Sequence, residues 1–305
     1  MNIKDVLGLY NLGEIQDVEK VNFGFSNKNY KLHASDKTYL YRIYDTKGQN
    51  VEYEISVLKV LKDLKFPASY PIQRRDGKLF TNTTEGIVVV YEYMDGSSTE
   101  INEQVVREIA RAQSKLHKIK YKSKGIGYRA NSISMDRCTN LIQKFDVAPV
   151  QYPEIFEYFI EHTNFFRMPL QIPVPKGLIH GDLFPQNTLF KGGELLAILD
   201  FQEVCIDSFL FDIGMTINGF CFEGRLFNEQ LTGIFLEEYN KTRAISDQEV
   251  KLLPVFISWA AHGIIAWHLE NDLLNKKNPK QLAKVEDLMV RVRSLRNSKL
   301  LISRL

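Results

Sequence analysis

The stretch from Gly177 to Phe201, GLIHGDLFPQNTLFKGGELLAILDF, decides the fold more than any other part of the chain. Residues 188–191 form a short run with apolar residues, Gly192-Gly193 follows, and residues 195–199 form a second apolar run. Two such runs on either side of a Gly-Gly pair predict a β-hairpin. The hairpin would return the chain to the loop that precedes its first strand, and Asp200 follows directly.

Three polar residues of this stretch are those that phosphoryl transfer needs. Asp182 is followed by four residues and then Asn187, which is the Asp-x-x-x-x-Asn spacing of a kinase catalytic loop. One carboxylate can orient a hydroxyl group and accept its proton. The amide oxygen of Asn187 and the carboxylate of Asp200 can hold Mg²⁺, which prefers hard oxygen ligands. A single loop Asp is more often a turn former, so the prediction depends on all three residues with the hairpin.

Several motifs of this region resemble those of a known superfamily. HGDLFPQNTLF at residues 180–190 and ILDF at residues 198–201 are similar to the catalytic and metal motifs of the aminoglycoside phosphotransferase and choline kinase superfamily. CIDSFLFDIG at residues 205–214 and INGFCFEG at residues 217–224 are most similar to bacterial homoserine kinases of this type. The resemblance covers nearly the whole chain. Its catalytic motif is specific for the superfamily and only suggestive for the substrate.

The resemblance implies an α+β, two-lobed, protein-kinase-like fold that uses ATP and Mg²⁺. Residues 1–94 would form a nucleotide-binding lobe with a small antiparallel sheet, and residues 95–305 a larger, mainly helical lobe for catalysis and substrate binding. The boundary follows the β-branched run at residues 86–93, where the turn chemistry changes at Met94-Asp95-Gly96. In the resembling enzymes a hinge lies here, so backbone groups of Glu92, Tyr93 and Met94 would bind the adenine.

Four further residues of this lobe are expected to bind the nucleotide. A tight turn at residues 26–29 would cover the phosphates through Ser26 and Asn27, although an ordinary β-turn fits the local sequence equally well. Arg42, in the β-rich run TYLYRIY, stands where the superfamily places a basic residue that touches the phosphates. Glu54, on a predicted helix, would orient Arg42, with Glu52 as the alternative partner. The competing interpretations are an edge-strand cation and a solvated helix-face acid.

Three more residues of the second lobe are expected to act structurally. Asp212 precedes an apolar helix and would tie the catalytic loop to that helix through backbone N–H groups. We expect a similar role for Asp207. His117, near the end of a helix that Asn102 should cap, is interpreted as a packed or capping histidine.

The acceptor substrate is predicted from the C-terminal helical segment. Homoserine is the first candidate from the resemblance, but those enzymes usually carry two arginines where this chain has Gly263 and His268. Trp259, Trp267 and Glu270, together with His268, suit an amine or quaternary ammonium through cation–π and ionic contacts. Choline, ethanolamine or an aminoglycoside is therefore the alternative, while the competing interpretation makes both tryptophans helix core residues. The basic C-terminal region disfavours a polycationic aminoglycoside.

The composition excludes several other classes. The 305 residues carry a net charge of +2, which favours neither nucleic acid nor a membrane surface as partner. The three cysteines lack C-x-x-C spacing, and no signal-peptide pattern is present, so we expect a cytoplasmic enzyme that is a monomer or homodimer. The apolar run at residues 256–269 is shorter than the roughly 20 residues of a membrane span. A catalytically silent, kinase-like binding module is the remaining alternative.

Overall fold

The computed structural model describes residues 3–21, 27–44, 51–146, 153–275 and 282–295. The chain divides into two compact units. Unit 1 comprises Met1–Ser98, Lys122–Gly127 and Thr188–Gln202, and unit 2 comprises Thr99–Tyr121, Tyr128–Asn187 and Glu203–Leu305.

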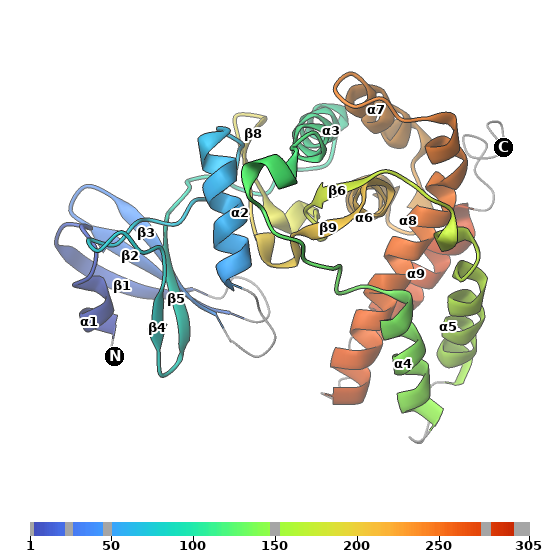
Figure 1. Cartoon of the computed structure of the whole chain (residues 1–305), viewed down its shortest axis with the longest axis horizontal. Helices are drawn as coiled ribbons and strands as arrows, with labels where there is room; N and C mark the ends of the chain where they lie inside the picture. The colour runs from blue at the N-terminus through green and yellow to red at the C-terminus, as the bar shows by residue number, and fades with distance from the viewer. Residues whose placement is uncertain (1–2, 22–26, 45–50, 147–152, 276–281, 296–305) are drawn as a thin grey trace. The chain divides into compact units, whose positions relative to one another are not determined.

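Unit 1 is built on an antiparallel sheet of five strands in the order β1-β2-β3-β5-β4 (Figure 1). A short helix α1 and the longer helix α2 accompany it. Apolar residues from α1 and from the sheet, among them Val6, Leu32 and Val90, form one buried core. The predicted antiparallel sheet of the first lobe is confirmed. The bounds are α1 Ile3–Leu7, β1 Ile15–Val21, β2 Lys28–Ala34, β3 Thr38–Tyr44, α2 Val51–Asp63, β4 Thr81–Thr83 and β5 Gly86–Glu92.

The predicted turn at residues 26–29 needs a correction. Lys28 and Asn29 belong to β2, where Asn29 pairs with Val21 of β1 and with Arg42 of β3. Ladder hydrogen bonds on both sides satisfy the backbone there, which a tight turn could not do. Asn27 lies directly before the strand, and Ser26 lies outside the described residues.

The predicted hairpin is confirmed and belongs to unit 1. Strand β7 (Thr188–Lys191) pairs with β8 (Glu194–Ile198), and Thr188 lies opposite Ile198. Gly192 and Gly193 connect them with φ of +61° and +85°. Left-handed backbone at both central positions is what a two-residue type I′ turn requires, and glycine adopts it without steric cost.

Unit 2 is mainly helical, as predicted. Its long helix α8 packs against α6, where the backbone of Gly214 comes so close to Phe256 that a Cβ atom would lie 2.5 Å from the Phe256 oxygen. Two small antiparallel sheets, β6–β9 and β10–β11, complete the unit. The bounds are α3 Glu103–His117, α4 Met135–Asp146, α5 Pro153–Phe166, β6 Lys176–Ile179, β9 Cys205–Ser208, α6 Phe209–Phe220, β10 Phe222–Glu223, β11 Leu226–Phe227, α7 Glu229–Asn240, α8 Asp247–His268 and α9 Leu282–Leu295.

Short helical turns link these elements. Within the described residues, single 3₁₀ turns occur at four places, and α8 continues as a π-helix. Helix α4 is an element for which the sequence analysis gave no prediction. The turns are η1 Tyr121–Lys124, η2 Pro169–Gln171, η3 Pro185–Asn187 and η4 Phe201–Glu203, and the π-helix is η5 Leu269–Asn275.

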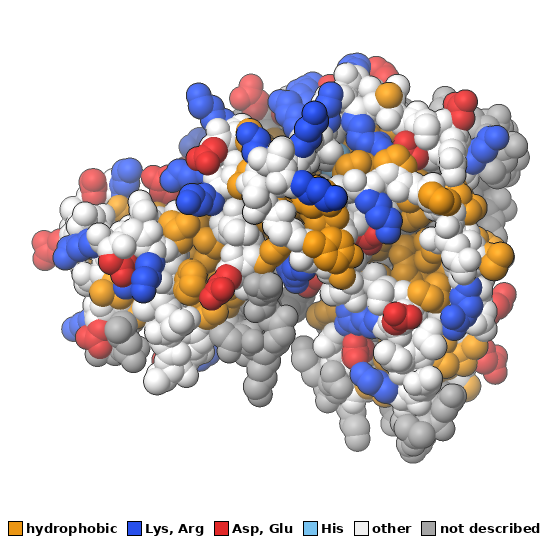
Figure 2. Space-filling view, in the orientation of Figure 1, with side chains coloured by type: hydrophobic (Ala, Val, Ile, Leu, Met, Phe, Trp, Pro, Cys, Tyr) orange, Lys and Arg blue, Asp and Glu red, His pale blue; other side chains and the backbone are white. Residues whose placement is uncertain are grey.

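Helix α8 and its extension are the part of the described chain that could cross a membrane by length and composition alone. Two thirds of its most apolar window, 67%, is buried inside the protein. That burial is typical of a core helix. On the face shown in Figure 2, acidic and basic side chains are both present on both units, in keeping with the small net charge.

Candidate active site

The catalytic loop in unit 2 follows strand β6 and is shaped by a glycine. Gly181 has φ +82°, and a Cβ atom there would lie 2.7 Å from the backbone oxygen of Glu203. Both the left-handed backbone and the close approach exclude a side chain. The turn closes when the Asp182 amide donates to Nδ1 of His180 at 3.2 Å. The backbone that carries Asp182 is therefore held in a defined orientation.

Asp182 and Asn187 are joined directly. The Nδ2 group of Asn187 donates to the backbone oxygen of Asp182 at 2.8 Å and to its Oδ2 at 2.9 Å. Both partners are acceptors, so the amide nitrogen must face Asp182. The amide oxygen of Asn187 then points elsewhere and is available to a cation. The structure thus brings the predicted base and one predicted metal ligand together.

Asp212, in the first turn of α6, holds the loop from beneath. Its Oδ1 accepts from the Gly181 amide at 2.7 Å, and its Oδ2 accepts from the His180 amide at 3.2 Å. Gln113 donates to the same Oδ2 at 2.8 Å. The side chain of Asp212 is fully buried, so these donors replace the water that an ionised carboxylate would otherwise need. The predicted tie between the loop and the next helix is confirmed.

A second histidine completes this buried network. His117 Nε2 lies 2.9 Å from Oδ2 of Asp212, and its Nδ1 lies 2.6 Å from the Tyr239 hydroxyl. Burial lowers the pKa of His117, although the bond to Asp212 opposes that shift. Burial by itself would raise the pKa of Asp212, but its hydrogen bonds outweigh burial and lower it. Both lowered pKa values agree with a neutral His117 that donates from Nε2 to an ionised Asp212. The predicted packed histidine is confirmed.

Asp207 does not share this role. Its Oδ2 accepts from Asn131 at 2.8 Å, and its Oδ1 lies 3.5 Å from the ammonium of Lys176. Asp207 sits on β9, which pairs along its length with β6, so its side chain is held beside the sheet and not under the loop. The expectation that Asp207 ties the catalytic loop is therefore wrong. It fastens the 128–133 segment instead.

In unit 1, Arg42 and Asp200 come together. The Nε of Arg42 donates to Oδ1 of Asn29 at 3.0 Å, and its Nη1 lies 4.0 Å from Oδ1 of Asp200. The second distance fits an ion pair and is too long for a hydrogen bond. Burial lowers the pKa of Arg42, but the nearby oxygens of Tyr44 and Asp200, with smaller contributions from other groups, outweigh it and raise the pKa overall. Arg42 is therefore a permanent cation in a mostly buried position.

Glu54 lies on α2 and is buried, and it accepts a hydrogen bond from a tyrosine. Its Oε1 accepts from the Tyr44 hydroxyl at 3.2 Å, and that hydroxyl is 2.6 Å from the hydroxyl of Tyr91. The guanidinium carbon of Arg42 lies 5.7 Å from the centre of the Tyr44 ring. The charge of Glu54 raises the pKa of Arg42 less than that of Asp200 does. Among the described residues, the ion pair of Arg42 is made with Asp200 and not with the predicted Glu54.

Asp200 has a strained backbone and an oxygen suited to a cation. Its φ is +60°, and in the described part of the chain Lys65 is the other non-glycine residue with positive φ. Such strain at a polar residue is typical of functional sites. Oδ1 is buried and accepts no hydrogen bond from the described residues. A hard, buried carboxylate oxygen without a donor fits Mg²⁺ bound to nucleotide phosphates.

The ligand set for such an ion would be only partly protein. Among the described residues, no group of three or more His, Cys, Asp or Glu side chains could hold a metal. Mg²⁺ commonly uses one or two carboxylates with phosphate oxygens and water. Such an ion would take its remaining ligands from the nucleotide and from water.

The three hinge residues predicted to contact adenine differ in whether their backbone groups are already hydrogen-bonded within the sheet. The Tyr93 amide donates to the backbone oxygen of Thr38 at 3.2 Å and is therefore engaged within the sheet. Because hydrogen-bonded pairs alternate along an antiparallel ladder, the backbone groups of Glu92, paired with Tyr39, point away from β3. Glu92 and Met94 stay predicted adenine contacts, and the amide of Tyr93 is excluded as a donor to adenine.

The predicted acceptor residues fall into two groups. Trp259 is buried, with 4% of its surface exposed, and its ring packs against Phe166 and His262. This burial favours the alternative that Trp259 is a core residue. Trp267 is 38% exposed and its ring meets His268 edge to face.

The polar members of that set already have partners. His268 Nδ1 lies 2.7 Å from Oδ2 of Asp272. Glu270 accepts from Arg137 at 2.9 Å and from Lys144 at 2.6 Å. Burial alone would raise the pKa of Glu270, but these two cations outweigh it and lower it. A carboxylate that two cations neutralise has little charge left for a substrate amine, which argues against Glu270 as its anion.

Gly263 shows why α8 carries no side chain at that position. A Cβ atom there would lie 2.6 Å from a methyl carbon of Ile133. The space is filled by the segment that precedes α4. An arginine at this position would have to displace Ile133.

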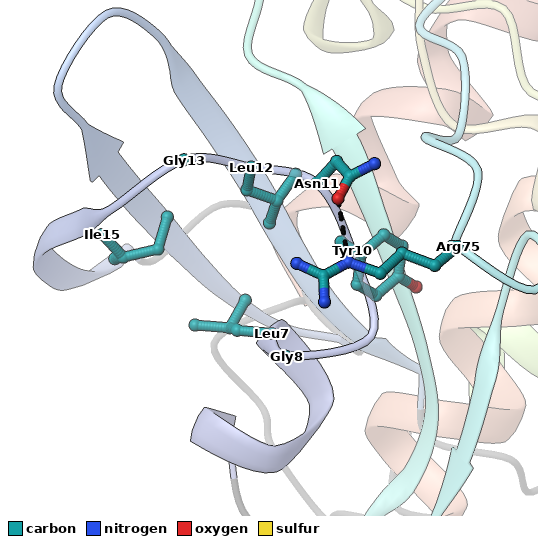
Figure 3. A pocket seen from close by; sticks show the side chains of 8 residues that line it. All are labelled: Leu7, Gly8, Tyr10, Asn11, Leu12, Gly13, Ile15 and Arg75. Carbon is teal, nitrogen blue, oxygen red and sulfur yellow. Dashed lines mark hydrogen bonds between the residues drawn. The ribbon is translucent and has the colours of Figure 1, made fainter.

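A cavity of about 500 Å³ lies elsewhere, in unit 1 (Figure 3). The N-terminal segment and Arg75 line it, and Arg75 Nε donates to Oδ1 of Asn11 at 2.8 Å. None of the predicted site residues lines this cavity. It does not change the assignment of the site.

Three residues that contact the predicted site residues were not expected from the sequence. Asn29 positions Arg42, Gln113 supports Asp212, and Tyr44 links Arg42 to Glu54. Each contact joins residues that belong to different elements. For Asn29 a signal exists, because a fully buried polar residue on a strand needs a partner on the neighbouring strand.

Comparison with known proteins agrees with this geometry. The model of the phosphotransferase enzyme family, abbreviated APH, matches residues 17–245. The chain belongs to this family. It is a small-molecule kinase with the predicted kinase-like fold, and membership in the family implies that it uses ATP.

Individual relatives are more distant. A homoserine kinase of Rhizobium johnstonii is 25% identical over 293 residues, which cover 91% of this chain and 90% of that protein. The solved structure of an amicoumacin kinase has a TM-score of 0.73 at 15% identity and covers 98% of this chain and 95% of that one. A choline/ethanolamine kinase family protein of Mesorhizobium loti has a TM-score of 0.69 at 16% identity, with 99% and 93% covered. The two structures establish the fold of this kinase and not its substrate.

Proposed function

We propose that this kinase transfers the γ-phosphoryl group of ATP to the hydroxyl of a small amine or amino acid, with Asp182 as the residue that receives the hydroxyl proton. One observation carries the proposal. Asn187 donates twice to Asp182, at 2.8 and 2.9 Å, on a loop that Asp212 anchors. A carboxylate held in one direction orients a nucleophile before reaction, which lowers the barrier by alignment.

The nucleotide phosphates and their metal ion are the next part of the proposal. Bound Mg²⁺ neutralises phosphate charge, and Asn187 and Asp200 are its proposed ligands. Arg42, charged and fixed by Asn29, would contact the phosphates. Asn27 belongs to the proposed phosphate loop.

The adenine is the other part of the nucleotide to be bound. The carbonyl of Glu92 and the amide of Met94 are its proposed partners. Residues two apart on an extended segment present their backbone groups on the same side. This geometry supports a pair of contacts to one adenine edge, and it agrees with the engaged amide of Tyr93.

Homoserine is the first proposed acceptor, because curated relatives with 25% identity over most of the chain carry the name homoserine kinase. Ethanolamine or choline is the second, supported by the similar solved structure of a Plasmodium vivax ethanolamine kinase and by the exposed Trp267. The close packing of Gly263 against Ile133 favours the second group, because it leaves no space for an arginine there.

Turnover with a panel of acceptors tests the proposal. Purified protein with Mg²⁺ and ATP is given homoserine, ethanolamine, choline or an aminoglycoside, and ADP release and the ³¹P spectrum of the product are recorded. We expect saturable stimulation by at least one acceptor and its loss in Asp182→Asn. Asp63→Asn, an exposed acid at the end of α2, is the matched control. Absence of stimulation with every acceptor would favour a silent binding module.

A further inference from the structure

Glu203 lies against the catalytic loop within unit 2. A Cβ atom built on Gly181 would lie 2.7 Å from the backbone oxygen of Glu203 and 3.3 Å from its Cβ. Gly181 directly precedes Asp182. The side chain of Glu203 therefore begins beside the glycine that immediately precedes Asp182, the residue proposed to receive the proton of the acceptor hydroxyl.

The carboxylate of Glu203 is oriented but not neutralised. Ser132 Oγ donates to its Oε2 at 2.7 Å, and the residue is exposed. No lysine, arginine or histidine in the described ranges forms a salt bridge with it. This sets it apart from its neighbours, because Asp207 faces Lys176 and Glu270 faces two cations.

The segment that orients Glu203 is itself fixed at several points. The Ile206 amide donates to the backbone oxygen of Arg129 at 2.9 Å, and Arg129 Nη1 donates to the Val204 oxygen at 3.1 Å. At the other end, Arg137 Nη1 donates to the Ser132 oxygen at 3.4 Å. The hydrogen bond from Ser132 orders the side chain of Glu203, and this ordering costs conformational entropy. A glutamate that is only solvated does not carry this cost.

We propose that Glu203 binds the protonated amine of the acceptor, with Ser132 as its positioning residue, so that the preferred acceptors are primary amines with a hydroxyl group a few bonds away. The inference rests on the proposed function of Asp182. An ammonium with N–H groups can donate to Oε1 and Oε2 of Glu203 in charge-assisted hydrogen bonds. A quaternary ammonium has no N–H to donate, so choline should be the poorer substrate.

The test is the variant Glu203→Gln, which keeps the shape and removes the charge. Steady-state kinetics are measured with homoserine, ethanolamine, choline and N-acetylethanolamine as acceptors. We expect the KM for homoserine and ethanolamine to rise about 10- to 100-fold, from the loss of one charge-assisted hydrogen bond. The KM for ATP should stay unchanged, and the preference for ethanolamine over N-acetylethanolamine should disappear.

Ser132 gives a second, graded measurement. Ser132→Ala removes the hydrogen bond that orients Glu203 and should raise the amine KM by less than Glu203→Gln does, with kcat almost unchanged. Ser132→Thr keeps the hydroxyl and should restore the KM. Glu157→Gln, an exposed acid on α5, is the charge-matched control and should behave as the wild type.

Binding without turnover separates this inference from the proposed function. The four acceptors are titrated into wild type and Glu203→Gln in the presence of Mg²⁺ and a non-hydrolysable ATP analogue, and heat is measured by calorimetry. Amine binding that Glu203→Gln abolishes supports the inference even when no product forms, a result that would overturn the proposed function alone. Equal amine affinity in both proteins, stronger binding of choline than of ethanolamine, or no binding of any primary amine to the wild type would overturn the inference.

Discussion

Asp212→Asn is the substitution for which the structure gives the most definite expectation. Oδ1 of Asp212 accepts a hydrogen bond from the Gly181 amide. Its Oδ2 is the acceptor for three donors, which belong to His180, Gln113 and His117. An asparagine loses fewest bonds when its nitrogen faces Gly181, because the remaining oxygen then keeps all three donors. The Gly181 amide and the new amide nitrogen face each other without an acceptor.

Two buried donors without partners set the magnitude. Each costs about 1–3 kcal/mol, so Asp212→Asn should lower the free energy of unfolding of unit 2 by about 4 kcal/mol. Water cannot accept hydrogen bonds from these donors, because the side chain at position 212 is fully buried. The release of the Gly181 amide also loosens the loop that holds Asp182, so phosphoryl transfer should fall together with stability.

Urea unfolding followed by tryptophan fluorescence measures this change selectively. The chain has two tryptophans, Trp259 and Trp267, and both belong to unit 2. Linear extrapolation gives the free energy, and an unchanged slope shows that the same surface unfolds. Asp207→Asn is the control, because this partly exposed acid contacts only side chains, and it should cost about 1 kcal/mol or less. A cost below about 1 kcal/mol for Asp212→Asn would refute the reasoning.

Four further outcomes are expected. Asp182→Asn should lower kcat about 100-fold or more while calorimetry shows normal nucleotide binding; near-normal turnover would remove Asp182 from its role. Asp200→Asn should weaken binding of the Mg²⁺ nucleotide, but not of the metal-free nucleotide, at least tenfold in the same calorimeter, and an equal effect on both would exclude a metal role. Gly181→Ala should destabilise unit 2 by about 2 kcal/mol or more in urea, since left-handed backbone costs about 1–2 kcal/mol and the added Cβ would lie 2.7 Å from a carbonyl oxygen; full stability would contradict this. Burial, with a smaller effect of His162, lowers the pKa of His262 to about 3. In the unfolded chain this histidine has a pKa near 6.5, so its contribution to the free energy of unfolding is complete above that pH and falls by about 2 kcal/mol at pH 5. His262→Phe should remove this part of the fall. An unchanged pH profile of stability would show that His262 is not its source.

Local patterns were sufficient for the elements and for part of the site. The spacing of Asp182 and Asn187, and the Gly192-Gly193 turn that leads to Asp200, lie within one short stretch. Asn102 was correctly predicted as a helix cap, since its side chain accepts from the Val105 amide at 3.0 Å. Such features are read along the chain because neighbouring residues create them.

Predictions of pairing between distant residues were less successful. Arg42 was expected to pair with Glu54, yet its ion pair is with Asp200, which is far away in sequence. Asp207 was expected beneath the catalytic loop, but β9 turns its side chain toward Asn131. Trp259 could face either a ligand or the core, and only the packing of α8 decides for the core.

The sequence by itself determined the resemblance to the family, the catalytic loop and the hairpin, because each depends on residue types at short spacing. Only the tertiary structure decided which buried charges meet, as in the contact of Asp212 with His117 and Gln113. It also decided that Glu203, beside the loop, forms no salt bridge with a cation in the described part of the chain. The physical reason is that a charge in the interior is defined by its partners, and these come from elements that are adjacent only after the chain has folded.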